Sequence, residues 1–254
     1  MIADKRTDVT NLDSAFLPIQ LLRSGASELG IELDDLQTDK LDQFARLLVE
    51  TNKTLNLTRI TEPEQIVTGH YLDSLSCLTV VKIKKKATVL DIGTGAGFPG
   101  IPIKIARPDL DVTLMDSSGK KLKFIDDAVA TLGLSGIGTI HTRAEQAGRD
   151  PAHREKYDIA IARALADMKA LVELCLPLVR VGGSLIAQKS ESSDEEIDLA
   201  RPLIGQLGGS IEKVSRVIIP KENVTRRLVV VTKNRPTPAD FPRQYSKIIK
   251  SKSR

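Results

Sequence analysis

Apolar residues recur at helical spacing through the first 80 positions of the chain. After a polar start, which we expect to be frayed over residues 1–13, the amphipathic segments 16–29 and 41–55 place apolar side chains on one face, which predicts two helices. Thr61 and Glu64 flank Pro63 in the pattern of a capping box, which predicts that a third helix begins there. We therefore expect a small helical subdomain over residues 1–83.

From residue 84 onward the pattern changes to short β-rich runs that alternate with helical segments. The expected strands are 88–92, 112–116, 138–141, 158–162, 184–188, 210–219 and 228–232. Such alternation is typical of a mostly parallel sheet with helices on both faces. No helical segment separates the last two strands, so we expect them to form an antiparallel hairpin. The sequence thus predicts a doubly wound, Rossmann-like α/β fold with seven strands over residues 84–234.

The basic charge of the chain is concentrated at its C-terminal end. The net charge is +4, and residues 233–254 alone hold seven Lys or Arg side chains against one acid, Asp240. An end of this composition is typical of proteins that touch a polyanion such as RNA, and equally of a solubilising segment, so both interpretations stay open. We expect residues 235–254 to form a basic, flexible tail.

The two cysteines and the hydropathy pattern exclude several classes of protein. Cys77 and Cys175 lie far apart within apolar helical segments, so we expect neither a disulfide framework nor a zinc site, and no metal is assigned. No window of the sequence approaches the roughly 18 apolar residues that a membrane span requires. We expect a soluble, cytoplasmic protein that acts as a monomer.

A glycine-rich loop follows the first expected strand. Residues 93–97 have the spacing GxGxG, and Gly93 and Gly95 lack the Cβ atoms that would keep a ligand away from the backbone. Dinucleotide-binding loops use GxGxxG instead, to bring a pyrophosphate onto a helix N-terminus. With Asp91 just before the glycines, the loop favours S-adenosylmethionine, which carries an amino acid group and a sulfonium and no pyrophosphate. A purely structural turn stays an alternative.

Charged residues follow three further strands, where ligands of this fold lie. Asp116 ends the second strand, about 20 residues past the loop, and is placed to accept both ribose hydroxyls, with helix capping as its alternative. Ala144 and Glu145 follow the third strand, where methyltransferases of this fold hold the adenine edge. Arg163 follows the fourth strand, and an ion pair with Asp167 is the alternative to a role in binding.

The sequence around Arg163 limits the kinds of atom that the enzyme is expected to methylate. Residues 160–164 contain neither the Asn/Asp-Pro-Pro-aromatic signature of exocyclic-amine methylation nor a Pro-Cys nucleophile for a pyrimidine carbon. A ring nitrogen such as guanine N7 carries a lone pair and no proton, so its methylation requires no general base and no covalent intermediate. His70, His141 and His153 are scattered and expected to be structural, and no catalytic acid, base or nucleophile is assigned.

Several motifs resemble those of the 16S ribosomal RNA guanine-N7 methyltransferases called RsmG, a family earlier named glucose-inhibited division protein B. The most specific is LDIGTGAGFPGIP at 90–102, in which two prolines follow the glycine loop. The similar segments span most of the chain and also include NK at 52–53, NLT at 56–58, HYLDSL at 70–75, DS at 116–117, GKK at 119–121, RAE at 143–145, RA at 163–164, GG at 182–183 and RLVV at 227–230.

The resemblance implies a class I methyltransferase that transfers a methyl group from S-adenosyl-L-methionine to N7 of a guanine in the 530 loop of 16S rRNA, with S-adenosyl-L-homocysteine as product. It implies the small ribosomal subunit or its precursor as the substrate. It also implies that Gly93, Phe98, Ala144, Glu145 and Arg163 line the cofactor site, beside Gly95 and Asp116 from the loop argument.

Three basic residues, Arg163, Lys189 and Arg227, are candidates to orient the guanine. The chain departs from the family pattern at Thr51, where many members have an aromatic residue, and at Ser190, where glycine is usual after the lysine. For segments 56–59 and 70–74, packing between the helical part and the sheet is the alternative to substrate contact. A methyltransferase acting on another RNA or on a small molecule, and a non-catalytic RNA-binding module, remain competing hypotheses.

Overall fold

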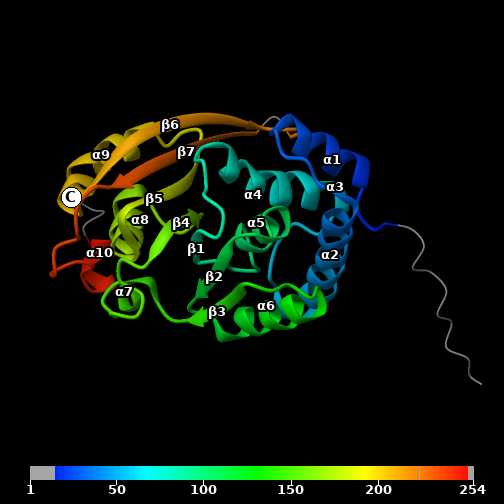
Figure 1. Cartoon of the computed structure of the whole chain (residues 1–254), viewed down its shortest axis with the longest axis horizontal. Coiled ribbons are helices and arrows are strands. Elements are labelled where there is room, and N and C mark those ends of the chain that lie inside the picture. Colours follow the sequence, from blue (N-terminus) through cyan, green and yellow to red (C-terminus); the bar gives the residue numbers. More distant parts are fainter. Residues whose placement is uncertain (1–14, 223, 251–254) are drawn as a thin grey trace, which may run out of the picture.

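The sheet at the centre of the structure has seven strands with helices on both sides (Figure 1). The computed structural model describes residues 15–222 and 224–250, so the polar start expected to be frayed lies outside the described residues. The strands are β1 (Thr88–Ile92), β2 (Asp111–Asp116), β3 (Ile137–His141), β4 (Tyr157–Arg163), β5 (Val179–Ser190), β6 (Gly209–Ile219) and β7 (Val224–Lys233). Their order is β3-β2-β1-β4-β5-β7-β6.

Strands β1 to β5 run parallel, and β7 pairs antiparallel with both β5 and β6. The predicted doubly wound sheet and its terminal hairpin are therefore confirmed. The chain winds outward from β1 through β2 to β3 and then returns to add β4 on the other side of β1. This reversal leaves a crevice at the carboxyl ends of β1 and β4, which is where open α/β sheets bind their ligands.

Alternate residues of the strands face opposite layers of the core. In β1, Val89 belongs to the apolar cluster under the N-terminal helices, whereas Leu90 and Ile92 belong to the cluster on the other face. The central strands β1 and β4 are buried on both faces, and each is a near-continuous run of apolar residues. The pleat thus assigns each face of the sheet to its own set of helices.

The helices differ in length and regularity. They are α1 (Ile19–Glu28), α2 (Asp35–Leu55), α3 (Pro63–Gln65), the π-helix η1 (Ile66–Leu72), α4 (Asp73–Leu75), the 3₁₀-helix η2 (Ser76–Thr79), α5 (Gly100–Ala106), α6 (Gly119–Thr131), α7 (Ala144–Ala147), α8 (Met168–Cys175), the 3₁₀-helix η3 (Leu176–Leu178), α9 (Asp194–Gln206) and α10 (Tyr245–Lys250). Within the described ranges, none of them is long and apolar enough to cross a bilayer.

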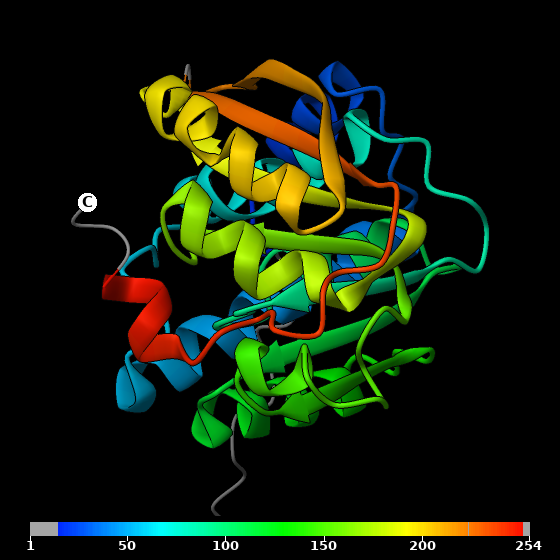
Figure 2. The ribbon, with the colours of Figure 1, turned by 90° about the vertical axis from the view of Figure 1, so that its left-hand side faces the viewer.

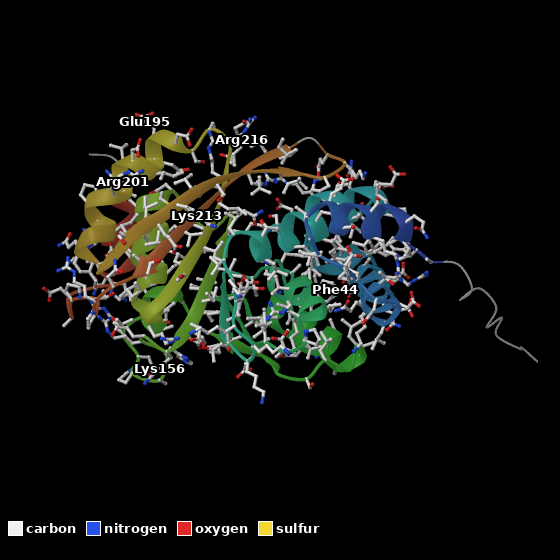
Figure 3. The ribbon with its side chains drawn as sticks, turned by 45° about the horizontal axis from the view of Figure 1, so that its top comes forward. Phe44, Lys156, Glu195, Arg201, Lys213 and Arg216 are labelled. Carbon is white, nitrogen blue, oxygen red and sulfur yellow. The ribbon has the colours of Figure 1, made fainter. Side chains whose placement is uncertain are left out.

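The N-terminal helices pack directly on one face of the sheet and share its apolar cluster. Phe44 of α2 is fully buried and lies inward in Figure 3, whereas the charged side chains of Glu195, Arg201 and Lys213 on α9 and β6 point outward. Because residues such as Leu22 and Phe44 belong to the same cluster as Ile101 and Leu114, the helical part and the sheet share one core. The division at residue 83 stays a prediction.

The third helix differs from its expected form. It begins at Pro63 as predicted, but its N-cap is Glu62, whose side chain makes no capping hydrogen bond among the described residues, so the capping box expected at Thr61 and Glu64 is wrong. The capping box that does form precedes α2, where the side chains of Asp34 and Gln37 cap each other's backbone N–H groups. The helix then continues through the π-helical segment η1, a rare geometry that is frequent at functional sites.

The segment after β7 packs against the main body. Residues 235–250 run along the α8 side of the sheet and end in α10 (Figure 2), while the flexibility expected of this segment stays a prediction. Lys233 is fully buried, and its amine donates to Leu176 O and Thr237 Oγ1. Residues 251–254 lie outside the described residues.

Candidate active site

The loop after β1 is shaped by a buried carboxylate. Asp91 is almost fully buried, and its Oδ2 accepts hydrogen bonds from Thr94 Oγ1 at 2.6 Å and from Gly100 N at 2.8 Å. Burial raises the pKa of Asp91 to about 6, against the lowering effect of these two donors. The expectation that this carboxylate serves the charged parts of a ligand is not met, because Asp91 braces the loop from inside and lines neither cavity described below.

The glycines of the loop have backbone conformations that other residues adopt at a cost. Gly93 and Gly95 have φ of 72° and 61°, in the left-handed region. A Cβ atom on Gly93 would lie 2.6 Å from Leu165 Cδ1, whereas one on Gly95 would meet no described atom within 4 Å. Gly95 therefore borders open space, and Gly93 sits at a narrow point that a side chain would fill.

Asp116 at the end of β2 accepts two backbone hydrogen bonds and lines a cavity, while its contact with a ribose stays a prediction. Its Oδ1 accepts from Ser118 N at 2.9 Å, at the start of α6, and its Oδ2 accepts from Gly95 N at 2.9 Å. The residue also lines a cavity, and each carboxylate oxygen retains a second lone pair. Asp116 thus fixes the glycine loop and still presents acceptors to a ligand.

Two cavities meet at the carboxyl ends of β1 and β4. The larger, about 560 Å³, lies on the side of the N-terminal helices, and the smaller, about 250 Å³, lies on the side of α7 and α10. Gly93 and Ala164 line both. Together the cavities fall in the range of about 300–1,000 Å³ that is usual for small-ligand sites. One elongated ligand can therefore occupy both sides of the glycine loop.

The smaller cavity has the hydrogen-bond acceptors and apolar surface that a nucleoside requires. Asp116, Ala144 and Glu145 line it, together with the apolar Leu165 and the aromatic Tyr245. Carboxylates accept hydrogen bonds from ribose hydroxyls and from an exocyclic amine, and apolar side chains cover a base. Because these residues suit adenosine, the site fits S-adenosylmethionine with its adenosine in this cavity.

A pair of stacked rings lines the larger cavity. The rings of His70 and Phe98 lie 4.3 Å apart at 15°, and the guanidinium carbon of Arg163 lies 5.5 Å from the centre of the Phe98 ring. His70 Nε2 is 2.8 Å from Thr58 Oγ1, and its Nδ1 is buried with no hydrogen-bond partner among the described residues. Burial and then the charge of Arg163 lower the pKa of His70 to about 3, so the ring is neutral.

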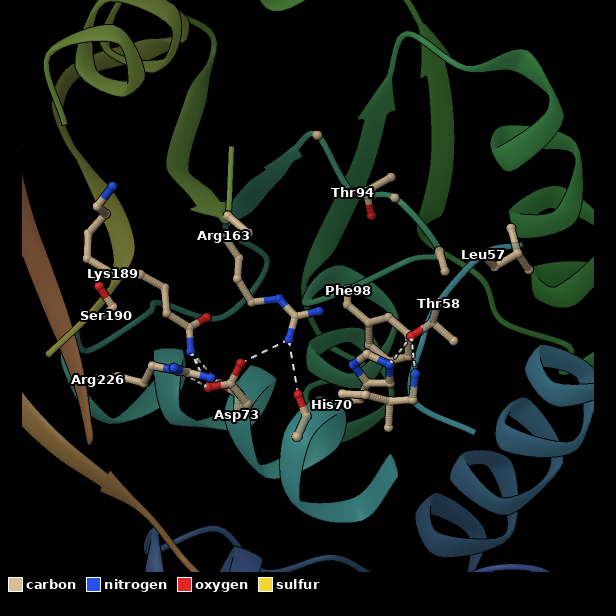
Figure 4. Close-up of a pocket in the computed structure, with 17 residues that line it drawn as sticks. Leu57, Thr58, His70, Asp73, Thr94, Phe98, Arg163, Lys189, Ser190 and Arg226 are labelled. Carbon is tan, nitrogen blue, oxygen red and sulfur yellow. Dashed lines mark hydrogen bonds and ion pairs between the residues drawn. The ribbon is translucent and has the colours of Figure 1, made fainter. Parts of the chain in front are cut away.

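Asp73 connects the helical part to the carboxyl end of the sheet. Its Oδ2 accepts from Arg163 Nη1 at 2.9 Å, and its Oδ1 accepts from Arg226 Nε at 2.7 Å and from Gln188 Nε2 at 2.8 Å (Figure 4). The Asp73 side chain is 3% exposed, against 18% for Arg163 and 29% for Arg226. One buried carboxylate therefore holds two guanidinium groups at the wall of the larger cavity.

Arg163 occupies the predicted place but not with the predicted alternative partner. It lines the larger cavity and pairs with Asp73, ninety residues earlier, whereas Asp167 caps α8 by accepting from Ala170 N. Phe98 lines the same cavity as expected. The helical part therefore packs against the sheet and also contributes residues to the cavity wall, while contact of segments 56–59 and 70–74 with the substrate stays a prediction.

Lys189 lines the larger cavity and Arg227 lines neither cavity, and both pair their charged groups with acidic side chains. The Lys189 amine donates to Ala166 O at 2.8 Å and lies 3.0 Å from Glu196 Oε1, and in Figure 4 it points away from Asp73. Arg227 forms two hydrogen bonds of 2.7 Å with Asp194. Successive residues of a strand face opposite sides, so Arg226 lines the cavity and Arg227 does not. The roles expected of Lys189 and Arg227 in orienting the guanine stay predictions, and Arg226 is the neighbouring arginine that reaches the cavity.

The sequence argument missed Asp73, Gln188 and Arg226, and it placed His70 among structural residues. Asp73 and His70 belong to the segment HYLDSL that resembled the known family, so that segment was the available signal. Gln188 and Arg226 carry no local signal, because their partner Asp73 is 115 and 153 residues away in sequence. In the described ranges, no group of three or more His, Cys, Asp or Glu side chains is arranged to hold a metal.

Solved structures with this fold include YcgJ from Bacillus subtilis, which is 12% identical with a TM-score of 0.51 over 65% of this chain and 100% of that one. P. horikoshii TYW2 in complex with MeSAdo is 14% identical, with a TM-score of 0.52 over 65% of this chain and 63% of that one. At these identities the likeness concerns the fold alone.

Protein sequences give a closer match. Residues 37–225 match the family described as rRNA small subunit methyltransferase G. Proteins named "Ribosomal RNA small subunit methyltransferase G" include one from Desulforamulus reducens, 46% identical over 88% of this chain and 93% of that protein, and one from Acetivibrio thermocellus, 44% identical over 90% and 93%. With a match over well over half of its length and relatives above 40% identity, the chain belongs to the rRNA small subunit methyltransferase G family.

Proposed function

We propose that this enzyme transfers a methyl group from S-adenosylmethionine to N7 of a guanine in the 530 loop of 16S rRNA. The observation that carries the proposal is the junction at Gly93 and Ala164, where a cavity suited to adenosine meets a larger cavity with cationic walls. The printed name of the relatives supplies the small-subunit rRNA, and the chemistry of the larger cavity favours a base whose methylation requires no proton transfer.

The cofactor side of the proposal rests on the loop and on three strand ends. When bound, S-adenosylmethionine supplies an electrophilic methyl group on a sulfonium. Asp116 and Glu145 would accept hydrogen bonds from the adenosine, and the backbone at Gly93 and Gly95 would allow it to pass close to the loop. Asp91 keeps the loop in this shape through Thr94 and Gly100, without touching the ligand itself.

On the substrate side, Arg163 and Arg226 would recognise the guanine. The Hoogsteen edge of guanine offers two acceptors, O6 and N7. If a guanidinium donates to O6 or to a flanking phosphate, N7 remains free with its lone pair. Asp73 keeps both guanidinium groups at the cavity wall. Guanine N7 carries no proton, so the neutral His70 is not required to act as a general base. Positioning and alignment then supply the acceleration.

The partner and the compartment follow from the substrate. We propose that the substrate is the small ribosomal subunit or its precursor, because proteins reach the base edges of RNA mainly in single-stranded loops such as the 530 loop. We propose that this methylation takes place in the cytoplasm. We also propose that the protein acts as a monomer.

Methyl transfer to three acceptors tests the substrate class. The full chain is incubated with labelled S-adenosylmethionine and small-subunit particles from cells that lack this gene, protein-free 16S rRNA, or guanosine nucleotides. Label in the particle or the rRNA supports the proposal and shows which form is preferred. Label in nucleotides alone would replace it with a small-molecule methyltransferase, and label in neither RNA form would overturn it.

A further inference from the structure

We infer that residues 235–250, here called the C-terminal arm, complete the cofactor site, and that Tyr245 binds the adenine ring. The inference rests on the proposed use of S-adenosylmethionine. It assigns the described part of the arm a role in addition to the two interpretations of the basic C-terminal end, the polyanion-binding arm and the solubilising tail. Four features carry it: two sets of anchors, the position of Tyr245 and the pairing of Arg243.

Two arginines of the main body hold the first part of the arm by its carbonyl groups. Arg154 donates to Thr237 O at 2.7 Å and to Phe241 O at 2.7 Å, and Arg149 donates to Pro242 O at 2.7 Å. Backbone carbonyls accept these bonds whatever side chain the residue carries, so they fix the path of the arm. The arm therefore reaches α10 along a defined route (Figure 2).

A buried acid holds the arm immediately before α10. Glu173 of α8 has no exposed side-chain surface, and its carboxylate accepts from Arg243 N at 2.9 Å, Nε at 2.8 Å and Nη2 at 2.6 Å. Three residues after Tyr245, Ile248 is 1% exposed and belongs to the apolar cluster on the α8 face. Tyr245 thus lies between two fixed points.

Tyr245 forms one wall of the smaller cavity. It lines this cavity together with Asp116, Glu145 and Leu165, which end or follow strands β2, β3 and β4. The guanidinium carbon of Arg143 lies 6.0 Å from the centre of its ring. Tyr245 is 44% exposed, in contrast to the buried Tyr71 and Tyr157, so its ring has surface left for a ligand to cover. An aromatic face stacks on any purine.

One cation of the arm serves to anchor it. Arg243 is paired with the buried Glu173, whereas Arg235 donates to Gly205 O from an exposed position and Lys247 is exposed. A cation that is paired with the protein's own buried carboxylate contributes little to counterion release on an RNA backbone. Arg243, immediately before α10, therefore holds the wall in place.

The test is the affinity for S-adenosylhomocysteine, measured by calorimetry on the full chain. Tyr245→Ala should weaken binding by about tenfold, as expected from the loss of one base-stacking ring, while Tyr245→Phe should stay within about twofold. Lys247→Ala is the matched control, because Lys247 lies on the same helix, is exposed and does not line the cavity. Adenosine should lose affinity in the same proportion as S-adenosylhomocysteine.

Tyrosine fluorescence gives an independent signal. The chain contains no Trp and three Tyr residues, so adenine that stacks on Tyr245 should quench the emission of the wild type and not that of Tyr245→Ala. If Tyr245→Ala binds both ligands as the wild type does, the inference is overturned and the proposed function stands. If the folded wild type binds neither ligand, the proposed cofactor itself is wrong.

Discussion

The guanidinium of Arg163, at the end of β4, lies 2.9 Å from the buried carboxylate of Asp73, which belongs to the N-terminal helical part. This ion pair joins the two halves of the larger cavity. Since Asp73 also holds Arg226 of β7, three distant segments of the chain must come together before either guanidinium is positioned. The larger cavity is thus a product of the whole fold, whereas most residues of the smaller cavity lie at or just after the ends of strands β1 to β4.

Removing the Asp73 carboxylate should cost both stability and activity. In Asp73→Ala, Arg163 and Arg226 lose their common partner, and we expect the free energy of unfolding to fall by about 2–4 kcal/mol, less than for a fully buried pair because both guanidinium groups are partly exposed. Urea denaturation measures the change. Asp194→Ala, which removes the surface partner of Arg227, is the control and should change stability little. Equal losses in the two variants would show that Asp73 has no special role.

The alternation along β7 predicts a contrast between two neighbouring arginines. Arg226→Ala should lower kcat/KM for the RNA by about 10- to 100-fold, the effect of one charge-assisted hydrogen bond, with S-adenosylhomocysteine affinity nearly unchanged. Arg227→Ala should retain the wild-type rate, because Arg227 is committed to Asp194 on the other side of the strand. The reverse order of rates would mean that the assignment of the two faces is wrong.

A side chain at Gly93 should block the junction between the two cavities. In Gly93→Asp the new Cβ would collide with Leu165, and the carboxylate would enter the space between the cavities, so we expect S-adenosylhomocysteine affinity to fall at least tenfold. Gly30→Asp is the control, because Gly30 has nearly the same φ of 73° and no described atom within 4 Å of its Cβ position. Calorimetry on both folded variants separates backbone strain from loss of the site.

His70 should make stability fall in weak acid. Its pKa is lowered from 6.5 to about 3 in the folded protein, so between these values the unfolded chain holds the additional proton and the folded chain does not. The free energy of unfolding should therefore decrease as pH falls from about 6.5 towards 3, by up to about 1.4 kcal/mol per pH unit from this group. The wild-type profile minus that of His70→Gln should show this slope, and parallel profiles would contradict it.

Most of the fold follows from periodicity in the sequence. The change from helical spacing to short β-rich runs near residue 84 is a repeated local signal, and the lack of a helix between β6 and β7 is enough to predict a hairpin. The boundaries are less predictable. The π-helix at 66–72 preserves an apolar periodicity close to that of an α-helix, so the sequence does not reveal it.

The residues of the two cavities also differ in how far they can be predicted from the sequence. Gly93, Gly95, Asp116, Ala144 and Glu145 all directly follow or end a strand, so knowing the strands places them at the carboxyl edge of the sheet. Asp73, Gln188 and Arg226 depend on contacts between remote segments, and the phase of β7 decides between Arg226 and Arg227. The sequence did not indicate a role for Tyr245, because the segment after β7 has the composition of a solvated tail. In the structure Arg149, Arg154 and Glu173 anchor this segment.

The central claim is methylation of a single guanine at N7. It is tested most directly on 16S rRNA from particles incubated with the enzyme and S-adenosylmethionine, because borohydride followed by aniline cleaves RNA at 7-methylguanosine and primer extension then locates the break. We predict one new stop, in the 530 loop, that requires both enzyme and cofactor. Incorporated methyl label with no new stop, or a stop elsewhere, would contradict the assignment of the atom or of the site.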